Sequence, residues 1–286
     1  MKRLITYYCI GALLYLCANL GYGQATPQHE ESNLSPDIYH VNYWLSGGLV
    51  VTGAITGQVG LSRVNNKDGI PSTHLGAIVN RGVSNFDQWS LRQNTKKMRE
   101  AAETSDKIFY GSIALPALLF LDKKIRHGWY DIALMYGEAQ ILNSNVYSWS
   151  PLGPTFVERY RPAVYYESLP LEERNYGRLR NSFYSGHTAT VAVGTFFAAK
   201  VFTDYHPSLG GKKYAFYGLA LIPPTVVGIY RIKALRHFPT DVVIGGVVGA
   251  GIGWLVPELH RKWKNKVSIS GTYSSEVKAM GLTYRF

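Results

Sequence analysis

Residues 231–256 read RIKALRHFPTDVVIGGVVGAGIGWLV, and this stretch decides the expected fold. Its first eleven residues include arginine, lysine, histidine and aspartate, whereas the fifteen residues of Val242–Val256 carry no charge. Within the uncharged part, Gly245, Gly249 and Gly253 recur every four residues, a spacing that lets membrane helices pack closely. The stretch therefore predicts a tightly packed apolar helix that directly follows a polar loop.

Apolar segments of similar length occur upstream. They are Tyr43–Leu61, Ile108–Leu121, Trp129–Val146, Thr188–Phe202 and Tyr214–Tyr230. Pro223 and Pro224 should kink the last of these. Hydrophobic residues make up 46% of the 286 residues and charged residues 17%, which excludes a disordered chain. Segments this short also occur in soluble cores. Taken together, they favour an all-α, membrane-embedded bundle of about five to six helices.

The C-terminal end of the chain has a different pattern. After a basic link at Arg261–Lys266, apolar residues alternate with polar ones on both sides of Ser274-Ser275. Alternation of this kind is typical of half-buried strands. Two strands cannot close a barrel, so the pattern predicts a short C-terminal β-hairpin that covers one end of the bundle.

Basic residues give the chain a net charge of +11 and predict its orientation. The links Lys123–His127, Lys212–Lys213 and Arg261–Lys266 face the cytoplasm under the positive-inside rule. Residues 161–187 and 231–241 then face the periplasm of a bacterial inner membrane. Basic and aromatic residues are not interleaved as nucleic-acid binding requires. The expected partners are therefore the membrane and a phosphorylated lipid, not a nucleic acid.

The first 23 residues resemble an export signal. Met1-Lys2-Arg3 is positive, an apolar run follows, and small residues precede Gln24, where a signal peptidase could cut. Both cysteines, Cys9 and Cys17, lie in this segment, so cleavage would leave a chain without thiols. An uncleaved membrane anchor is the alternative.

Three short patterns carry the residues suited to chemistry on a phosphate. They are R-P, S-G-H and R-x5-H-x3-D, with Arg161, Ser185, Gly186, His187, Arg231, His237 and Asp241 as their members. Free backbone N–H groups at the helix start after Ser185 attract an anion, and arginine side chains match phosphoryl oxygens. His237, with Asp241 four residues later, predicts an oriented nucleophile, and His187 predicts a proton donor.

In this order the patterns resemble the signature of the phosphatidic acid phosphatase type 2 (PAP2) superfamily, which also includes vanadium-dependent haloperoxidases. The resemblance spans about residues 106–257, and the family signature is K-x6-R-P, P-S-G-H and S-R-x5-H-x3-D. It implies that His237 becomes a phosphohistidine with the assistance of Asp241, and that His187 is the general acid. It also implies a phosphate cradle formed by Arg161, Ser185, Gly186 and Arg231.

The chain departs from the family signature at three positions. The lysine, the proline and the serine of the signature fall on Pro154, Tyr184 and Tyr230. Loss of the lysine removes one cation from the phosphate cradle. The candidates to replace it, chosen by proximity in sequence, are Arg159, Lys233 and Arg236.

The expected organisation has four parts: a leader (1–23), an N-terminal segment with a weak apolar helix (24–105), a PAP2-like phosphatase domain (106–258), and a basic link with the hairpin (259–286). The expected function is hydrolysis of a phosphomonoester or pyrophosphate on a lipid, without a cofactor. The charged loop Val164–Arg180, which includes Arg178, is expected either to select the headgroup or simply to be solvated. The histidines show no metal-ligand spacing, so no metal site is expected. Two alternatives stay open: a vanadium-dependent haloperoxidase, and a non-catalytic lipid-binding membrane protein.

Overall fold

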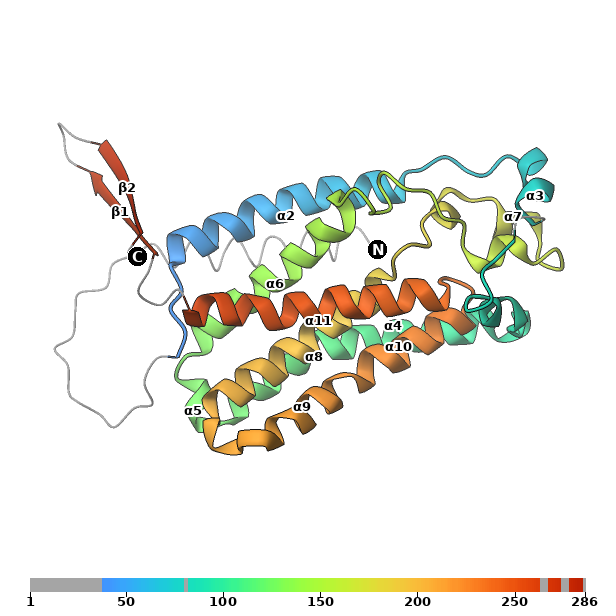
Figure 1. The fold of residues 1–286 in the computed structure, drawn as a ribbon. Helices are drawn as coiled ribbons and strands as arrows, with labels where there is room; N and C mark the ends of the chain where they lie inside the picture. The colour runs from blue at the N-terminus through green and yellow to red at the C-terminus, as the bar shows by residue number, and fades with distance from the viewer. Residues whose placement is uncertain (1–37, 80–81, 263–266, 274–277, 285–286) are drawn as a thin grey trace. The chain divides into compact units, whose positions relative to one another are not determined.

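The computed structural model describes residues 38–79, 82–262, 267–273 and 278–284 (Figure 1). The expected leader lies outside these ranges, so the export signal and its cleavage stay predictions. The α-helices are α2 (Tyr43–Asn65), α3 (Ser72–Val79), α4 (Met98–Ala114), α5 (Lys123–Arg126), α6 (Trp129–Trp149), α7 (Leu171–Arg174), α8 (Gly186–Tyr205), α9 (Lys213–Ala220), α10 (Ile222–Lys233) and α11 (Pro239–Lys262). The 3-10 helices are η1 (Gln88–Arg92), η2 (Thr95–Lys97), η3 (Leu115–Leu121), η4 (Pro162–Tyr165), η5 (Gly177–Arg180) and η6 (Pro207–Lys212).

Helices dominate the described residues, as the apolar segments predicted. The helices outnumber the expected five or six, because the connections between the long helices contain short helices of their own. Near the C-terminus, β1 (Val267–Tyr273) and β2 (Lys278–Tyr284) pair antiparallel, with Val267 opposite Tyr284. The residues that join these two strands lie outside the described ranges, so the complete hairpin stays a prediction.

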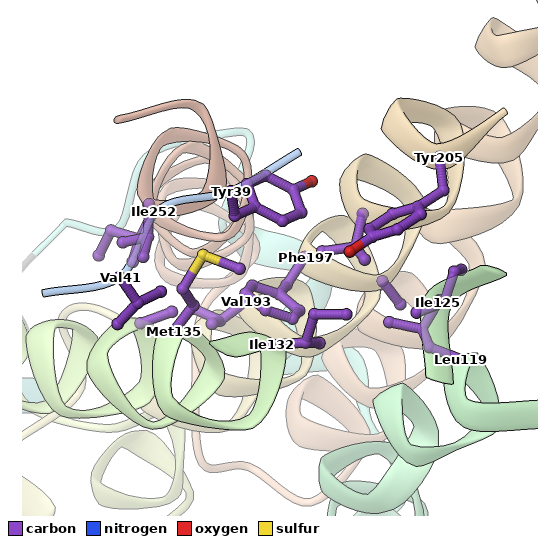
Figure 2. Close-up of a cluster of buried hydrophobic side chains, with 14 residues drawn as sticks. Tyr39, Val41, Leu119, Ile125, Ile132, Met135, Val193, Phe197, Tyr205 and Ile252 are labelled. Atoms are coloured by element: carbon purple, nitrogen blue, oxygen red, sulfur yellow. The ribbon is translucent and has the colours of Figure 1, made fainter. Parts of the chain in front are cut away.

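Helix α8 lies at the centre of the helical part and packs against α4, α6, α10 and α11. Most of its side chains are apolar or small, and its buried Lys200 is paired with Asp204 and Glu258, as expected for a helix surrounded by other helices. Figure 2 shows the main core, where Val193 and Phe197 of α8 pack with Ile132 and Met135 of α6 and Ile252 of α11. This packing fixes the N-terminus of α8, at which the S-G-H pattern begins.

The regularly spaced glycines bring α11 directly against α8. A Cβ atom on Gly249 would lie 2.1 Å from the carbonyl oxygen of Ala189, and one on Gly245 would lie 2.5 Å from that of Ser185. No larger residue fits either position without moving backbone. The close packing predicted from the glycine spacing is therefore present, and it places the start of α11 beside the start of α8.

The segment with two prolines is divided into two helices at Leu221, whose own dihedral angles (φ −73°, ψ −24°) stay helical. Helix α9 ends at Ala220 and α10 begins at Ile222, so Pro223 and Pro224 lie in the first turn of α10. A helix has no intrahelical partner for the N–H groups of its first turn, so proline loses nothing there.

Three segments are long and apolar enough to cross a membrane by length and composition. They are α2, residues Pro207–Lys233 and α11. Large apolar side chains on their outer faces, such as Leu49 and Val247, are more than half exposed, which suits contact with lipid. The direction in which the chain crosses stays a prediction.

A second apolar cluster holds together the loops that carry the three motifs. Ile70 comes from the segment after α2, Val164 and Leu179 from the loops after α6, and Leu235 from the turn between α10 and α11. Leu235 has a positive φ of 55°, which is rare for a side chain of this size, and its complete burial stabilises that conformation. The motif loops are thus fixed relative to one another at one end of the bundle.

Candidate active site

The three sequence motifs meet at one cavity of about 290 Å³. Its lining combines cationic, imidazole and polar side chains from α2, α4, α6, α8, α10 and the loops, namely Leu61, Val64, Asn65, Phe109, Gln140, Asn143, Ser144, Tyr147, Arg161, Arg178, Asn181, Gly186, His187, Thr190, Arg231 and His237. No carboxylate is among these residues. The cavity is therefore suited to an anion.

Arg161 enters the cavity from the residue before η4. Pro162 begins that 3-10 helix, and the backbone N–H of Arg161 donates to the carbonyl of Leu179 at 2.8 Å. Its Nε donates to the carbonyl of Asn181 at 3.2 Å. Burial, followed by the positive charge of Arg236, lowers the pKa of Arg161 to about 10, so the side chain remains a cation at neutral pH.

The N-terminus of α8 forms another wall of the cavity. Ser185 is the N-cap residue, and its Oγ accepts a hydrogen bond from the backbone N–H of Thr188. Gly186 follows Ser185 at the first position of the helix, where a Cβ atom would lie in ordinary contact with the ring of Tyr147, at 3.4 Å. The free N–H groups of the first turn give the cavity a dipole that attracts an anion.

Arg231 lies in the last turn of α10 and is 6% exposed. Its Nη1 donates to Oδ1 of Asp106 and to Oγ of Ser105, both at 3.3 Å. Its Nε is buried without a hydrogen-bond partner in the described part of the chain. An unpaired buried donor is unfavourable, so this group is suited to binding an oxygen in the cavity.

His237 is almost fully buried, and a single hydrogen bond fixes its tautomer. Nδ1 lies 2.6 Å from the carbonyl oxygen of Ser182, which can only accept, so Nδ1 carries the hydrogen. The neutral ring then has its lone pair on Nε2. Burial, followed by the positive charges of Arg161 and Arg231, lowers the pKa of His237 well below its ordinary value. The ring is therefore neutral at physiological pH, with a lone pair on Nε2.

Asp241 does not form the direct hydrogen bond to His237 that the four-residue spacing predicted. Its Oδ2 lies 3.9 Å from Nδ1 of His237 and instead accepts from Oγ of Ser182 at 2.6 Å and from the backbone N–H of Phe238 at 2.7 Å. Asp241 is thus an N-terminal cap of α11 that also holds Ser182, and Ser182 holds the histidine. The carboxylate acts on the ring through one intermediate residue.

A second layer of charge supports Asp241. Arg159 bridges it to Asp87, whose Oδ2 lies 2.7 Å from Nη2 of the arginine. Asp87 also accepts from the backbone N–H of Thr240 at 2.9 Å, and so caps α11 from a distant loop. Arg159 lies outside the cavity lining and is occupied by these two carboxylates.

His187 is the second residue of α8 and lies at the cavity beside α4. Its Nε2 is 3.1 Å from Oδ1 of Asp106, and the ring of Phe109 packs against it with centroids 4.4 Å apart. Burial lowers the pKa of His187 to about 4, against the opposing effect of the hydrogen bond to Asp106. When protonated, the ring has a second N–H that can be donated to a leaving group.

The three departures from the family signature leave the rest of the site in place. Pro154 is buried in the turn after α6 and does not line the cavity, so the position of the family lysine contributes nothing there. Of the expected replacements, Lys233 is exposed beside the ring of Tyr230, and Arg236 donates to the hydroxyl of Tyr176. None of the three candidates lines the cavity.

Sequence patterns did not reveal Asp87, Asp106 and Ser182, and they placed Arg178 only in a loop expected to select the headgroup or to be solvated. Asp87 and Asp106 lie far from the motifs in sequence, and Ser182 lies three residues before Ser185 but belongs to none of the three patterns, so no local spacing marks these residues as part of the site. In the described ranges, no group of three His, Cys, Asp or Glu residues is placed to hold a metal ion. The positive charge at this site comes from arginine side chains and the α8 N-terminus.

Comparison with known proteins agrees with the motifs. Residues 129–265 match the PAP2 superfamily, which confirms the resemblance drawn from the sequence. Among solved structures, the chain is similar to the first transmembrane PAP2 type phosphatidylglycerolphosphate phosphatase from Bacillus subtilis, with 20% identity and a TM-score of 0.42 over 77% of this chain and 98% of that one. No curated protein matches the chain.

Proposed function

Because residues 129–265 match the PAP2 superfamily, we propose that this protein is a lipid phosphate phosphatase that forms a phosphohistidine on His237. One observation carries the proposal. The Ser182 carbonyl occupies Nδ1 of His237, which leaves Nε2 with the lone pair in a ring that lines an arginine-rich cavity. A neutral, oriented imidazole beside fixed cations is what attack on a phosphate ester requires.

In the first step, Nε2 of His237 attacks the phosphorus atom. A P–N bond forms while the P–O bond to the lipid breaks, and protonated His187 donates its proton to the departing oxygen. Arg161, Arg231 and the backbone N–H groups after Ser185 stabilise the charge on the non-bridging oxygens. The positive charge that develops on the His237 ring is stabilised by the Nδ1–H bond to the Ser182 carbonyl.

In the second step, water attacks the phosphohistidine. His187, now neutral, accepts a proton from the water as it bonds to phosphorus. The P–N bond breaks, its electron pair returns to Nε2, and inorganic phosphate leaves the cavity. Both histidines are then in their starting states.

The substrate class follows from the setting of the cavity. Three segments are apolar enough to cross a membrane, and the cavity is lined by the first turns of α8 and by His237, just before α11. A lipid that carries a phosphomonoester or a diphosphate can place its headgroup there while its chains stay in the bilayer. We propose that this end faces the periplasm, in accordance with the distribution of basic residues.

Phosphate release from a panel of lipids tests this function. The purified protein in detergent is assayed with phosphatidic acid, phosphatidylglycerophosphate, a polyprenyl diphosphate and lipid A. At least one should be hydrolysed in excess EDTA, because arginines supply the positive charge, and vanadate should inhibit. Failure on all four, or activity that returns only with added magnesium, would contradict the proposal.

A further inference from the structure

We propose that Arg178 is a third phosphate-binding cation, and that it takes over the role of the lysine that this chain replaces with Pro154. The inference rests on the proposed function, since it assigns a further residue to the same phosphoryl cradle. It differs from the sequence-based expectation, which placed Arg178 in a loop that selects the headgroup or is simply solvated.

Arg178 lines the same cavity as Arg161 and Arg231. Its side chain has no hydrogen-bond or ion-pair partner in the described ranges, whereas the neighbouring arginines are occupied. Arg231 pairs with Asp106, and Arg236 donates to Tyr176. Arg178 therefore has its full set of N–H donors available for an incoming anion.

The backbone that carries Arg178 is held firmly at the cavity. The two residues after it, Leu179 and Arg180, accept backbone hydrogen bonds from Arg161 and Arg159 at 2.8 and 3.1 Å. The residue before it, Gly177, packs so tightly that an added Cβ would lie 1.7 Å from the carbonyl of Lys67. Contacts on both sides fix where this segment runs, so Arg178 is a component of the cavity wall.

The excess of positive charge around the cavity favours an anionic ligand over a neutral one. Three arginines line it, no carboxylate does, and only one of the three has a carboxylate partner in the described part of the chain, Asp106. Like charges this close repel one another unless an anion is bound. A phosphoryl group with two negative charges compensates them, and the planar forks of arginine suit its oxygens.

Inhibition by inorganic phosphate and orthovanadate tests the role of Arg178. In Arg178→Ala we expect the inhibition constants of both anions and the KM of the lipid substrate to rise about tenfold, the effect of losing about 1.4 kcal/mol of binding. Arg178→Lys should recover part of the affinity, since it keeps the charge but not the fork. Lys233→Ala removes an exposed cation outside the cavity and should leave all three constants unchanged.

Two results would overturn the inference. The first is an Arg178→Ala variant that melts like the wild type and keeps its inhibition constants. The second is an equal loss of phosphate and orthovanadate affinity in Lys233→Ala, which would indicate a general effect of net charge. If the wild type hydrolyses none of the lipids, calorimetric titration with orthovanadate decides independently: tenfold weaker binding to Arg178→Ala supports the inference, and unchanged binding or none to the wild type contradicts it.

Discussion

Ser182 links the proposed nucleophile to the carboxylate behind it. Its carbonyl holds Nδ1 of His237, and its Oγ donates to Asp241. In serine proteases, changing the carboxylate that directly orients the histidine to an amide costs about 10⁴-fold in kcat. Because Asp241 acts here through Ser182, we expect Asp241→Asn to lower kcat by about a hundredfold.

Ser182→Ala provides the matched comparison. It keeps the carbonyl that holds His237 and removes only the hydroxyl that reaches Asp241, so we expect about a tenfold loss of kcat with little change in KM, the effect of one hydrogen bond to a charged group. Steady-state kinetics on the lipid substrate measure both variants. A larger effect of Ser182→Ala than of Asp241→Asn would contradict this order of contacts.

The two histidines predict an acidic pH optimum. His237 must be neutral, and its pKa lies well below 6.5, so it is ready across the physiological range. His187 must be protonated, but burial lowers its pKa to about 4, so the active fraction decreases as the pH rises. We expect kcat/KM for a lipid substrate to fall about a thousandfold between about pH 5 and pH 8, since each of these three units above the pKa reduces the protonated fraction about tenfold.

A substrate with a good leaving group tests whether this pH dependence comes from proton donation by His187. Nitrophenyl phosphate needs no proton on its leaving oxygen, so its rate should depend less on pH and should survive His187→Ala better than lipid turnover does. An equal loss for both substrates in His187→Ala would show that the residue is not the general acid.

At the scale of single elements, the packing of α8 against α11 sets the distance between the motifs. Gly249 is in contact with the backbone of α8, whereas a methyl group added to Gly251, on the same helix, would meet nothing within 4 Å. Gly249→Ala should therefore force the helices apart and cost about 2 kcal/mol, as overpacked cores do. Gly251→Ala should be neutral or slightly stabilising, because alanine favours helices.

Thermal melting in detergent, with phosphatase activity as a second readout, compares the two glycine variants. Gly249→Ala should melt at a lower temperature and lose activity, because the starts of α8 and α11 carry Ser185 and Asp241. Equal melting temperatures for the two variants would show that the contact between the helices does not govern the site.

At the scale of the whole molecule, the long helices and the meeting of three motifs could be predicted from the sequence. Spacing and hydropathy are local properties. They predicted the segments that form α8 and α11, and the motif residues Arg161, His187 and His237 all line one cavity. The contacts of Asp241 could not be predicted, since a four-residue spacing does not fix which oxygen faces the ring. The short helices of the loops were also missed, because they lack a periodic pattern.

The boundary expected between the N-terminal segment (24–105) and the phosphatase domain (106–258) stays a prediction. Helix α4 begins at Met98 and continues to Ala114, so one helix crosses the expected boundary. Asp106 on this helix contacts both His187 and Arg231, and Asp87 supports the start of α11 through Thr240. Residues of the expected N-terminal segment thus contribute to the site, namely Asp87 behind Asp241 and Leu61, Val64 and Asn65 in the cavity lining.

The orientation of the chain in the membrane can be determined by labelling single cysteines. Exposed Glu172 lies in α7 among the site loops, and exposed Lys213 begins α9. In a background without Cys9 and Cys17, a thiol reagent that does not cross membranes should label Glu172→Cys in intact spheroplasts and Lys213→Cys only after lysis. The reverse pattern would place the cavity on the cytoplasmic side.

Trapping the covalent intermediate tests the central claim most directly. The enzyme is mixed with a lipid carrying a radiolabelled phosphate and quenched in denaturant at alkaline pH, because a phosphohistidine is stable in base and labile in acid. Peptide mapping should place the label on His237, and His237→Ala should neither acquire label nor turn over substrate while it melts like the wild type. A label on another residue, or wild-type turnover by His237→Ala, would contradict the account.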